Sequence, residues 1–257
     1  MSQVKPKKHL GQHFLKDTNI AEKIVLSLKL HQNYNILVEI GPGTGVLTQF
    51  LIKYPQQLHL IEIDRESIEY LKTAYDHSAF QIWQQDFTRI NLSAITEGKI
   101  GIIGNFPYNI SSQIFFKILE YPDQVQEVVC MLQKEVAQRI SAGPGSKRYG
   151  ILSVLLQTYF DIEYLFDVPP QVFLPPPKVT SGVIRLSRNQ VENIPCDKKL
   201  FFRVVKQAFQ MRRKTLRNAL KILTLPTHLH DNPLLSQRAE QLSVNDFIFI
   251  TQAIQNP

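Results

Sequence analysis

The sequence of 257 residues contains only two cysteines, Cys130 and Cys196, and they lie far apart. Neither has another Cys or a His nearby at the spacing of metal ligands, so the pattern predicts no disulfide framework and no zinc site. The one close histidine pair, His228 and His230, lies in a loop flanked by prolines and is typical of a surface. We therefore expect no metal.

Long hydrophobic runs and internal repeats are also missing. No apolar stretch approaches the ~18 residues of a membrane helix, and the basic start from Met1 to Leu10 has no apolar core like that of a signal peptide. Hydrophobic residues make up 44% of the chain and charged residues 20%, which indicates a globular protein rather than a disordered one. We expect a cytoplasmic monomer with one domain of ordinary size and a smaller companion, and no membrane partner.

Acidic residues are scarce in the C-terminal part of the chain. Residues 188–257 hold 11 Lys and Arg against 5 Asp and Glu, a net charge of +6, whereas residues 1–187 have a net charge of +1. The segment from Lys198 to Lys221 carries nine basic residues and no acidic one. A solvated helix face is the alternative, but such faces generally mix both signs. The asymmetry favours contact with a polyanion, and nucleic acid is the best candidate.

From Asn35 onward, short apolar runs alternate with amphipathic stretches. This alternation predicts an α/β fold with a parallel sheet and crossover helices. Two further strands, Asp161–Val168 and Val179–Leu186, are joined by a proline-rich turn, so a terminal antiparallel hairpin completes the predicted sheet. The predicted parallel strands are Ile36–Ile40, Leu58–Ile63, Phe80–Trp83, Ile100–Gly104 and Val125–Leu132, and the predicted helices are Leu47–Tyr54, Ser67–Tyr75, Ser112–Leu119 and Tyr149–Phe160.

The pattern changes near Ser187 to Pro195, a polar and weakly patterned stretch. Beyond it the apolar spacing is helical. Gln241–Ile254 predicts one more helix, with Ser243 or Asn245 as its N-cap. We therefore predict an α/β domain over residues 1–187 and a small α-helical domain over residues 188–257. The helical spacing rests on Phe201, Val204, Val205 and Ala208, followed by Leu216, Ala219, Leu220 and Leu223.

The turn after the first predicted strand is rich in glycine. Residues 39–45 read EIGPGTG, and glycines at this point let the backbone turn sharply and approach a ligand closely. A dinucleotide-binding fingerprint would need a further glycine where Val46 stands. The actual spacing, with Pro42 inside it, favours a nucleoside ligand without a pyrophosphate.

Acidic side chains follow the next two predicted strands. Glu62 is placed to accept hydrogen bonds from both ribose hydroxyls, while Asp64 is predicted as the N-cap of the following helix. Asp86 is placed to accept from an adenine amine, although a cap or turn explains this residue about equally well by itself. Because the carboxyl ends of parallel strands meet at one edge of a sheet, these residues together predict a nucleoside site.

The fourth predicted strand leads into Asn105, Phe106, Pro107 and Tyr108, which we call the base clamp. The Asn105 side-chain oxygen and the Phe106 carbonyl can accept the two hydrogens of an exocyclic amine, Pro107 fixes the backbone, and Tyr108 can stack on the base. Acceptors around adenine N6 favour a pyramidal nitrogen with a localised lone pair, which methylation requires. Taken alone, the same four residues are equally well explained as a turn.

Seven blocks in this order resemble the ribosomal RNA adenine dimethyltransferases, most closely the bacterial small-subunit (16S) type. The resemblance covers nearly the full chain. It implies a Rossmann-like S-adenosylmethionine-dependent methyltransferase sheet and N6,N6-dimethyladenosine as the product at two adjacent adenosines near the 3′ end of 16S ribosomal RNA in the assembling small subunit. The blocks are KKHLGQHFL (7–15), VEIGPGTG (38–45), IEID (61–64), Asp86-Phe87, GNFPYNIS (104–111), VFLPPPKVTSGVIRL (172–186) and RRKTLRNAL (212–220).

The resemblance also implies roles for individual residues. Phe173 would join Tyr108 in stacking on a flipped adenine, whereas an isolated Phe at this position predicts a hydrophobic plug. The donor pocket would be lined by His13, Leu15, Gly41, Gly43, Glu62, Ile63, Asp86, Phe87 and Asn105. Ribosomal RNA phosphates would be bound, in a strongly salt-dependent way, by Lys5, Lys7, Lys8, Arg203, Lys206, Arg212, Arg213, Lys214, Arg217 and Lys221.

Two residues depart from the family pattern, since many relatives have Asn where His13 stands and Leu where Phe106 stands. Both changes are compatible with catalysis, although donor affinity can shift. The alternatives are an assembly factor that binds ribosomal RNA with little catalysis, and a methyltransferase for large-subunit RNA or for DNA adenine. A dehydrogenase is disfavoured by Val46 and by the base clamp.

Overall fold

The computed structural model describes residues 4–30 and 32–256. Their contacts divide into two compact units, the first running to Ala137 and including Asp161–Arg188. The second consists of Gln138–Phe160 together with the residues from Asn189 onward. Residues 138–160, which the sequence pattern placed with the α/β domain, therefore group with the helical unit in this division.

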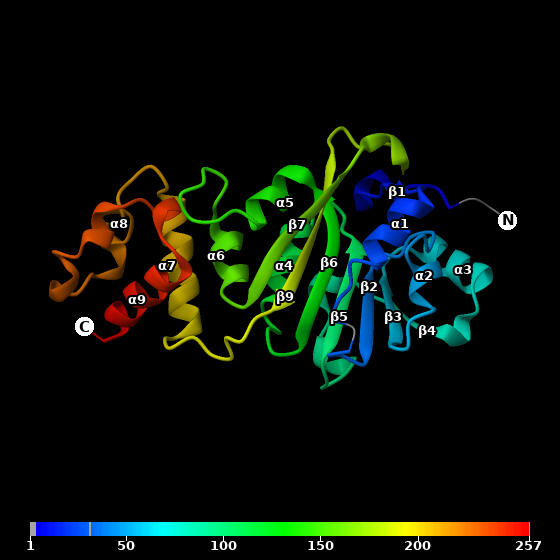
Figure 1. The fold of residues 1–257 in the computed structure, drawn as a ribbon, viewed down its shortest axis with the longest axis horizontal. Helices are drawn as coiled ribbons and strands as arrows, with labels where there is room; N and C mark the ends of the chain where they lie inside the picture. The colour runs from blue at the N-terminus through cyan, green and yellow to red at the C-terminus, as the bar shows by residue number, and fades with distance from the viewer. Residues whose placement is uncertain (1–3, 31, 257) are drawn as a thin grey trace. The chain divides into compact units, whose positions relative to one another are not determined.

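The first unit is built on a seven-stranded sheet in the order β4-β3-β2-β5-β6-β9-β7 (Figure 1). The pairs from β4 to β6 are parallel, and β9 is antiparallel to β6. This arrangement confirms the predicted α/β class, with the strands on either side of the proline-rich turn at one end of the sheet. The strands are β2 (Ile36–Ile40), β3 (Gln57–Glu62), β4 (Phe80–Gln84), β5 (Ile100–Asn105), β6 (Val125–Gln133), β7 (Phe160–Val168) and β9 (Ser181–Arg188).

The central strands are covered on both faces. Every residue of β2 is buried, and so are the residues of β3 from Leu58 and those of β5 up to Gly104. Near-continuous apolar runs are what such parallel strands require, whereas β4 at the sheet edge buries only Phe80 and exposes Gln81 and Gln84. The strand order reverses between β2 and β5, and this reversal opens a crevice at the carboxyl edge of the sheet.

Two helices of the first unit, α1 and α3, begin where an aspartate caps them. Asp17 accepts from the backbone of Asn19 and Ile20 at the start of α1, and Asp64 caps α3 as predicted. The sequence pattern did not predict α1, which packs against α2 and β6. The helix bounds are α1 (Thr18–Val25), α2 (Thr48–Leu51), α3 (Arg65–Ala74) and α4 (Ser111–Ile118). Helix α5 (Lys134–Ile140), which was also not predicted, begins in the first unit and ends in the second.

The second unit is helical, as predicted. The residues Phe201, Val204, Val205 and Ala208 form the buried face of α7. Ser243 is the N-cap of α9, because its side chain accepts from the Asp246 backbone while the Asp246 carboxylate accepts from the Ser243 backbone. The main helices are α6 (Ile151–Gln157), α7 (Lys198–Gln210), α8 (Leu216–Ala219) and α9 (Val244–Gln255).

A small second sheet joins two distant parts of the first unit. β1 (Phe14–Leu15) pairs antiparallel with β8 (Phe173–Leu174), next to the proline-rich turn. Over residues 4–30 and 32–256, no helix is long and apolar enough to span a membrane. The same residues contain no group of three or more His, Cys, Asp or Glu able to hold a metal ion.

Candidate active site

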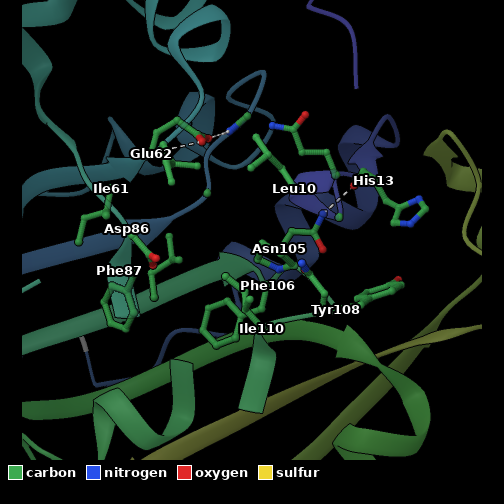
Figure 2. A pocket seen from close by; sticks show the side chains of 18 of the residues that line it. Leu10, His13, Ile61, Glu62, Asp86, Phe87, Asn105, Phe106, Tyr108 and Ile110 are labelled. Carbon is green, nitrogen blue, oxygen red and sulfur yellow. Dashed lines mark hydrogen bonds between the residues drawn. The ribbon is translucent and has the colours of Figure 1, made fainter. Parts of the chain in front are cut away.

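A cavity of about 250 Å³ lies at the carboxyl edge of the sheet (Figure 2). It is far larger than the ~30 Å³ of one water molecule, so it has room for an organic ligand rather than a single ion. Its wall is formed by strand ends, by the base clamp and by residues 9–14. The predicted site residues that line it are His13, Gly41, Gly43, Glu62, Ile63, Asp86, Phe87, Asn105, Phe106 and Tyr108.

Leu15 and Phe173 are placed elsewhere. They face each other across β1 and β8 and are only 3% and 1% exposed, within the hydrophobic core. Neither belongs to the wall of the large cavity, although Leu15 borders a small neighbouring cavity together with Glu39 and Asn105. Stacking of Phe173 on a base would therefore require its side chain to leave this core.

The glycine turn has the backbone that only glycine adopts easily. Gly41, Gly43 and Gly45 have φ values of 64°, 56° and 77°. A Cβ atom on Gly43 would lie 2.8 Å from the Phe14 ring, whereas one on Gly41 would meet nothing within 4 Å. Gly41 therefore leaves open space that a ligand can fill, and the predicted close approach of ligand to backbone is sterically possible.

Glu62 is held in one orientation by three backbone amides. Gly43 N–H donates to Oε2 at 3.1 Å, and the N–H groups of Ile63 and Asp64 donate to Oε1 at 2.8 and 2.9 Å. Burial raises the pKa of Glu62 more than these hydrogen bonds lower it. Each carboxylate oxygen has two lone pairs, so Oε2 retains an acceptor position for a ligand hydroxyl.

Asp86 caps a 3₁₀ turn, which is one of the two explanations that the sequence left open for this residue. Its Oδ1 accepts from the backbone and the hydroxyl of Thr88, at 2.9 and 2.8 Å, at the start of the 3₁₀ turn Phe87–Arg89. Oδ2 lies 3.8 Å from Arg89 Nε, which is too far for a hydrogen bond. Because Asp86 also lines the cavity, a cap role for Oδ1 leaves Oδ2 as a possible acceptor for a ligand amine.

The base clamp offers two acceptors, the Asn105 side-chain oxygen and the Phe106 carbonyl. Asn105 Nδ2 donates to the His13 carbonyl at 2.9 Å, drawn as a dashed line in Figure 2. A carbonyl can only accept, so this contact fixes the amide and leaves the Asn105 oxygen for the cavity. The Phe106 ring is buried edge to face against Phe115, with 5.8 Å between centroids. The buried ring is not available to a ligand, so the predicted role of Phe106 stays with its backbone carbonyl.

Tyr108 is held at its hydroxyl and on one ring face. Its hydroxyl hydrogen-bonds to the fully buried Ser181 Oγ, and its ring stacks on His13 with 5.4 Å between centroids and 29° between planes. Burial raises the pKa of Tyr108, partly opposed by the Ser181 hydrogen bond, so the phenol stays neutral at physiological pH. These contacts hold the aromatic ring ready for stacking.

Sequence reasoning missed most of the N-terminal wall of the cavity. His9, Leu10, Gly11, Gln12 and Phe14 all line it, yet only His13 was predicted from this stretch. The signal was the length of the KKHLGQHFL block, since a resemblance that extends over nine residues indicates more than one useful side chain. The cavity is further lined by Ile40, Ile61, Gln85, Pro107, Asn109 and Ile110.

The predicted RNA-binding residues differ in their surroundings. Arg212 is half-buried, donates to the Lys147 carbonyl and lies 3.4 Å from the Glu240 carboxylate. Arg217 donates to the His230 carbonyl, and Lys7 forms ion pairs with Asp64 and Glu66. Arg217 is nevertheless exposed, and so are the remaining predicted residues, Lys5, Lys8, Arg203, Lys206, Arg213, Lys214 and Lys221.

The sheet order and the ligand crevice define a Rossmann-like α/β protein, and two solved structures share this fold. The dimethyladenosine transferase from Plasmodium falciparum superposes with a TM-score of 0.82 at 23% identity, over 95% of this chain and 98% of the other. The 23S rRNA methyltransferase ErmE superposes with a TM-score of 0.71 at 20% identity, over 94% and 99%. At these identities the likeness establishes the fold alone.

Sequence comparison identifies the family. The model described as ribosomal RNA adenine dimethylase matches residues 3–256, so the chain belongs to that family. It is 54% identical to the protein named ribosomal RNA small subunit methyltransferase A of Cytophaga hutchinsonii, over 99% of both chains. It is also 54% identical to the protein of the same name in Flavobacterium johnsoniae, over 99% of this chain and 98% of the relative. The predicted family and methyltransferase class are confirmed.

Proposed function

We propose that this chain transfers methyl groups to N6 of two adjacent adenosines near the 3′ end of 16S ribosomal RNA in the assembling small subunit. The observation that carries the proposal is the orientation of Asn105, because one of its two amide N–H bonds donates to the His13 carbonyl and leaves its oxygen able to accept from a ligand. With the Phe106 carbonyl it offers two acceptors beside the cavity, one for each hydrogen of an adenine amine. The names of the relatives support the small subunit as the substrate.

We infer that the methyl donor is S-adenosylmethionine, whose sulfonium supplies an electrophilic methyl group. The cavity fits its nucleoside part, because Gly41 leaves room for a ligand and Glu62 Oε2 keeps an acceptor position for ribose. Asp86 Oδ2 would accept from the adenine amine of the donor. Ile63 and Phe87, which also line the cavity, would contact its ring.

The chain's own residues would act by position and electrostatics rather than by strong base catalysis. Asn105 Oδ1 and the Phe106 carbonyl accept from the target amine, which favours the pyramidal nitrogen with its lone pair available for direct displacement. Tyr108 stacks on the flipped adenine and thereby holds the target base in place beside the donor. Holding both reactants in line supplies much of the remaining acceleration.

The basic residues of the second unit are proposed to bind the RNA substrate through its phosphates. Six of those predicted there are exposed, namely Arg203, Lys206, Arg213, Lys214, Arg217 and Lys221. Such contacts release counterions, so affinity for RNA is expected to fall steeply as salt rises. Arg212 has a structural role within the unit in addition, because it contacts Lys147 and Glu240.

The proposal is tested by mapping the product on RNA. Purified protein is incubated with S-adenosylmethionine and unmethylated small subunits, and the RNA is digested and analysed by mass spectrometry. We expect N6,N6-dimethyladenosine at two adjacent positions near the 3′ end of 16S RNA and none on large-subunit RNA. Modification of large-subunit RNA alone would contradict the assignment of the substrate. Absence of donor binding by calorimetry would instead indicate an assembly factor.

Replacing Ser181 by alanine is expected to weaken use of the RNA substrate without changing donor affinity. The substitution leaves the Tyr108 hydroxyl without its buried partner and frees the ring to leave its stacking position. We expect kcat/KM for RNA to fall about tenfold, equivalent to roughly 1.4 kcal/mol. Ser181→Thr, which keeps a hydroxyl, is the matched control and should recover most of the loss. Wild-type kcat/KM in the alanine variant would argue against this positioning.

A further inference from the structure

Residues 7–14, the N-terminal segment, provide one wall of the cavity through residues 9–14 and contact the loop that follows the base clamp. The 3₁₀ turn Lys8–Leu10 ends at Gly11, whose φ of 67° reverses the chain. A Cβ atom on Gly11 would lie 2.5 Å from Asn109 Oδ1, so the backbone of the segment lies directly on that loop. On its other side the segment reaches the end of β3.

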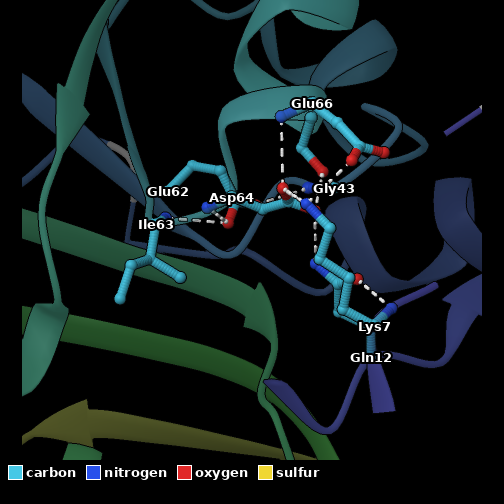
Figure 3. Close-up of polar contacts among 8 residues, drawn as sticks. Lys7, Gln12, Gly43, Glu62, Ile63, Asp64 and Glu66 are labelled. Carbon is cyan, nitrogen blue, oxygen red and sulfur yellow. Dashed lines mark hydrogen bonds and ion pairs between the residues drawn. The ribbon is translucent and has the colours of Figure 1, made fainter. Parts of the chain in front are cut away.

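Just after β3, the segment forms a closed ring of polar groups with Asp64, the N-cap of α3 (Figure 3). Lys7 Nζ lies 2.5 Å from Asp64 Oδ1, and Gln12 Nε2 donates to Asp64 Oδ2 at 3.0 Å. Lys7 N–H donates to Gln12 Oε1 at 2.7 Å and so closes the ring. Lys7 Nζ also lies 3.1 Å from Glu66 Oε1. Both ends of the turn are thereby tied to one carboxylate.

The Asp64 carboxylate is buried, and the N-terminal segment supplies the lysine that pairs with its charge. The Asp64 side chain is 0% exposed, whereas that of Lys7 is 29% exposed. Burial pushes the pKa of Asp64 upward, but the hydrogen bonds from Lys7 and Gln12, with that from the Glu66 backbone, outweigh it and the pKa is lowered. Asp64 therefore stays charged at neutral pH, and removing its partner would leave a buried charge uncompensated.

The ring is also directly connected to the donor side of the cavity. The Asp64 backbone N–H donates to Glu62 Oε1 at 2.9 Å, and Glu62 is the proposed ribose acceptor. The part of the segment near the base clamp has ties of its own, because His13 Nδ1 lies 2.7 Å from the Pro175 carbonyl and Phe14 begins β1. Opening the ring should therefore disturb the donor wall more than the clamp.

We propose that Lys7 is a positioning residue for donor binding, which together with Gln12 and Asp64 holds the N-terminal segment closed over the cavity. This inference rests on the proposed function and deepens it. It replaces the role in RNA binding that the basic N-terminus predicts for Lys7. Its ammonium group already faces two carboxylates, whereas Lys5 and Lys8 are exposed and remain suited to phosphates.

The test compares Lys7→Met with the matched control Lys8→Met, which removes an equal charge one residue away. Lys7→Met is expected to raise KM and Kd for S-adenosylmethionine about tenfold, because the wall must then be ordered when the donor binds. Its kcat at saturating donor should stay within about twofold of wild type. Lys8→Met should leave donor KM unchanged and reduce the salt dependence of RNA binding by about one unit of slope. Lys7→Arg should restore donor affinity.

The inference is overturned if Lys7→Met binds the donor as wild type does, or if it reduces the salt slope as Lys8→Met does. Calorimetry on the wild-type protein separates this failure from failure of the proposed function, since a wild type that binds no donor refutes the function itself. Gln12→Leu opens the same ring without removing a charge. If circular dichroism shows that Lys7→Met is unfolded, this second variant tests whether the ring supports donor binding. It too should raise donor Kd, and an unchanged Kd would count against the ring.

Discussion

Asn105→Ala is expected to lower kcat for methyl transfer by about 100- to 1,000-fold, the usual cost of removing one group that stabilises a transition state. The alanine removes the side-chain acceptor for the adenine amine and leaves only the Phe106 carbonyl. It also removes the donor to the His13 carbonyl, so a smaller rise in donor KM should accompany the loss. Single-turnover rates at saturating donor isolate the chemical step from donor binding.

Two further variants separate the acceptor from the packing around it. Asn105→Asp keeps an oxygen at the clamp but places a carboxylate against the His13 carbonyl, so donor binding should suffer more than in the alanine variant. The exposed Asn33, in the loop before β2, is the matched control, and Asn33→Ala should have wild-type rates. If Asn105→Ala retained a rate within about fivefold of wild type, the clamp would not act through the Asn105 oxygen.

Features set by local sequence could be predicted. The bounds of β2 are as predicted, Ile36–Ile40, because a short apolar run between turn residues has few alternatives. The glycine turn was recognisable because a left-handed backbone at Gly41 and Gly43 selects glycine. The clamp and Glu62 followed from their place at strand ends, where a parallel sheet gathers its ligand groups.

Features set by contacts distant in sequence could not be predicted. Lys7 was counted as one of several basic residues, because a charge pattern gives no sign of a carboxylate 57 residues away. The burial of Phe173 depends on the pairing of β8 with β1, two strands of two residues each that have no periodicity to detect. In both cases a partner that is distant in the sequence occupies the side chain.

The grouping of residues 138–160 with the helical unit also depends on contacts between residues that are distant in the sequence. Their helical spacing is equally compatible with either unit. The structure resolves the choice through aromatic packing, because Tyr149 is buried edge to face on Phe209, which in turn contacts Phe247. Aromatic side chains bury large areas when they pack. Local periodicity does not indicate against which neighbour they pack.

Glu39, in the middle of the sheet, makes the stability of the first unit depend on pH. It is 1% exposed, and Thr48 Oγ1 donates to its Oε2 at 2.7 Å. Burial raises the pKa of Glu39 to about 8, opposed by the Thr48 hydrogen bond and assisted by the nearby Glu62 carboxylate. The unfolded chain releases this proton near pH 4.3. Between these two pH values the folded state holds a proton that the unfolded state has lost, so stability is full below about pH 4 and decreases as pH rises toward 8.

Glu39→Gln is therefore expected to stabilise the first unit increasingly as pH rises. The amide stays neutral, and its oxygen can still accept from Thr48. Each proton difference is worth about 1.4 kcal/mol per pH unit, so the gain over wild type should grow by roughly 3–4 kcal/mol between pH 5 and pH 8. Denaturant unfolding followed by fluorescence of Trp83, the single tryptophan, reports on this unit. A difference between variant and wild type that did not change with pH would mean that Glu39 is already ionised in the folded sheet. The hydrogen bond from Thr48 would then stabilise the Glu39 carboxylate far more than one hydrogen bond ordinarily does.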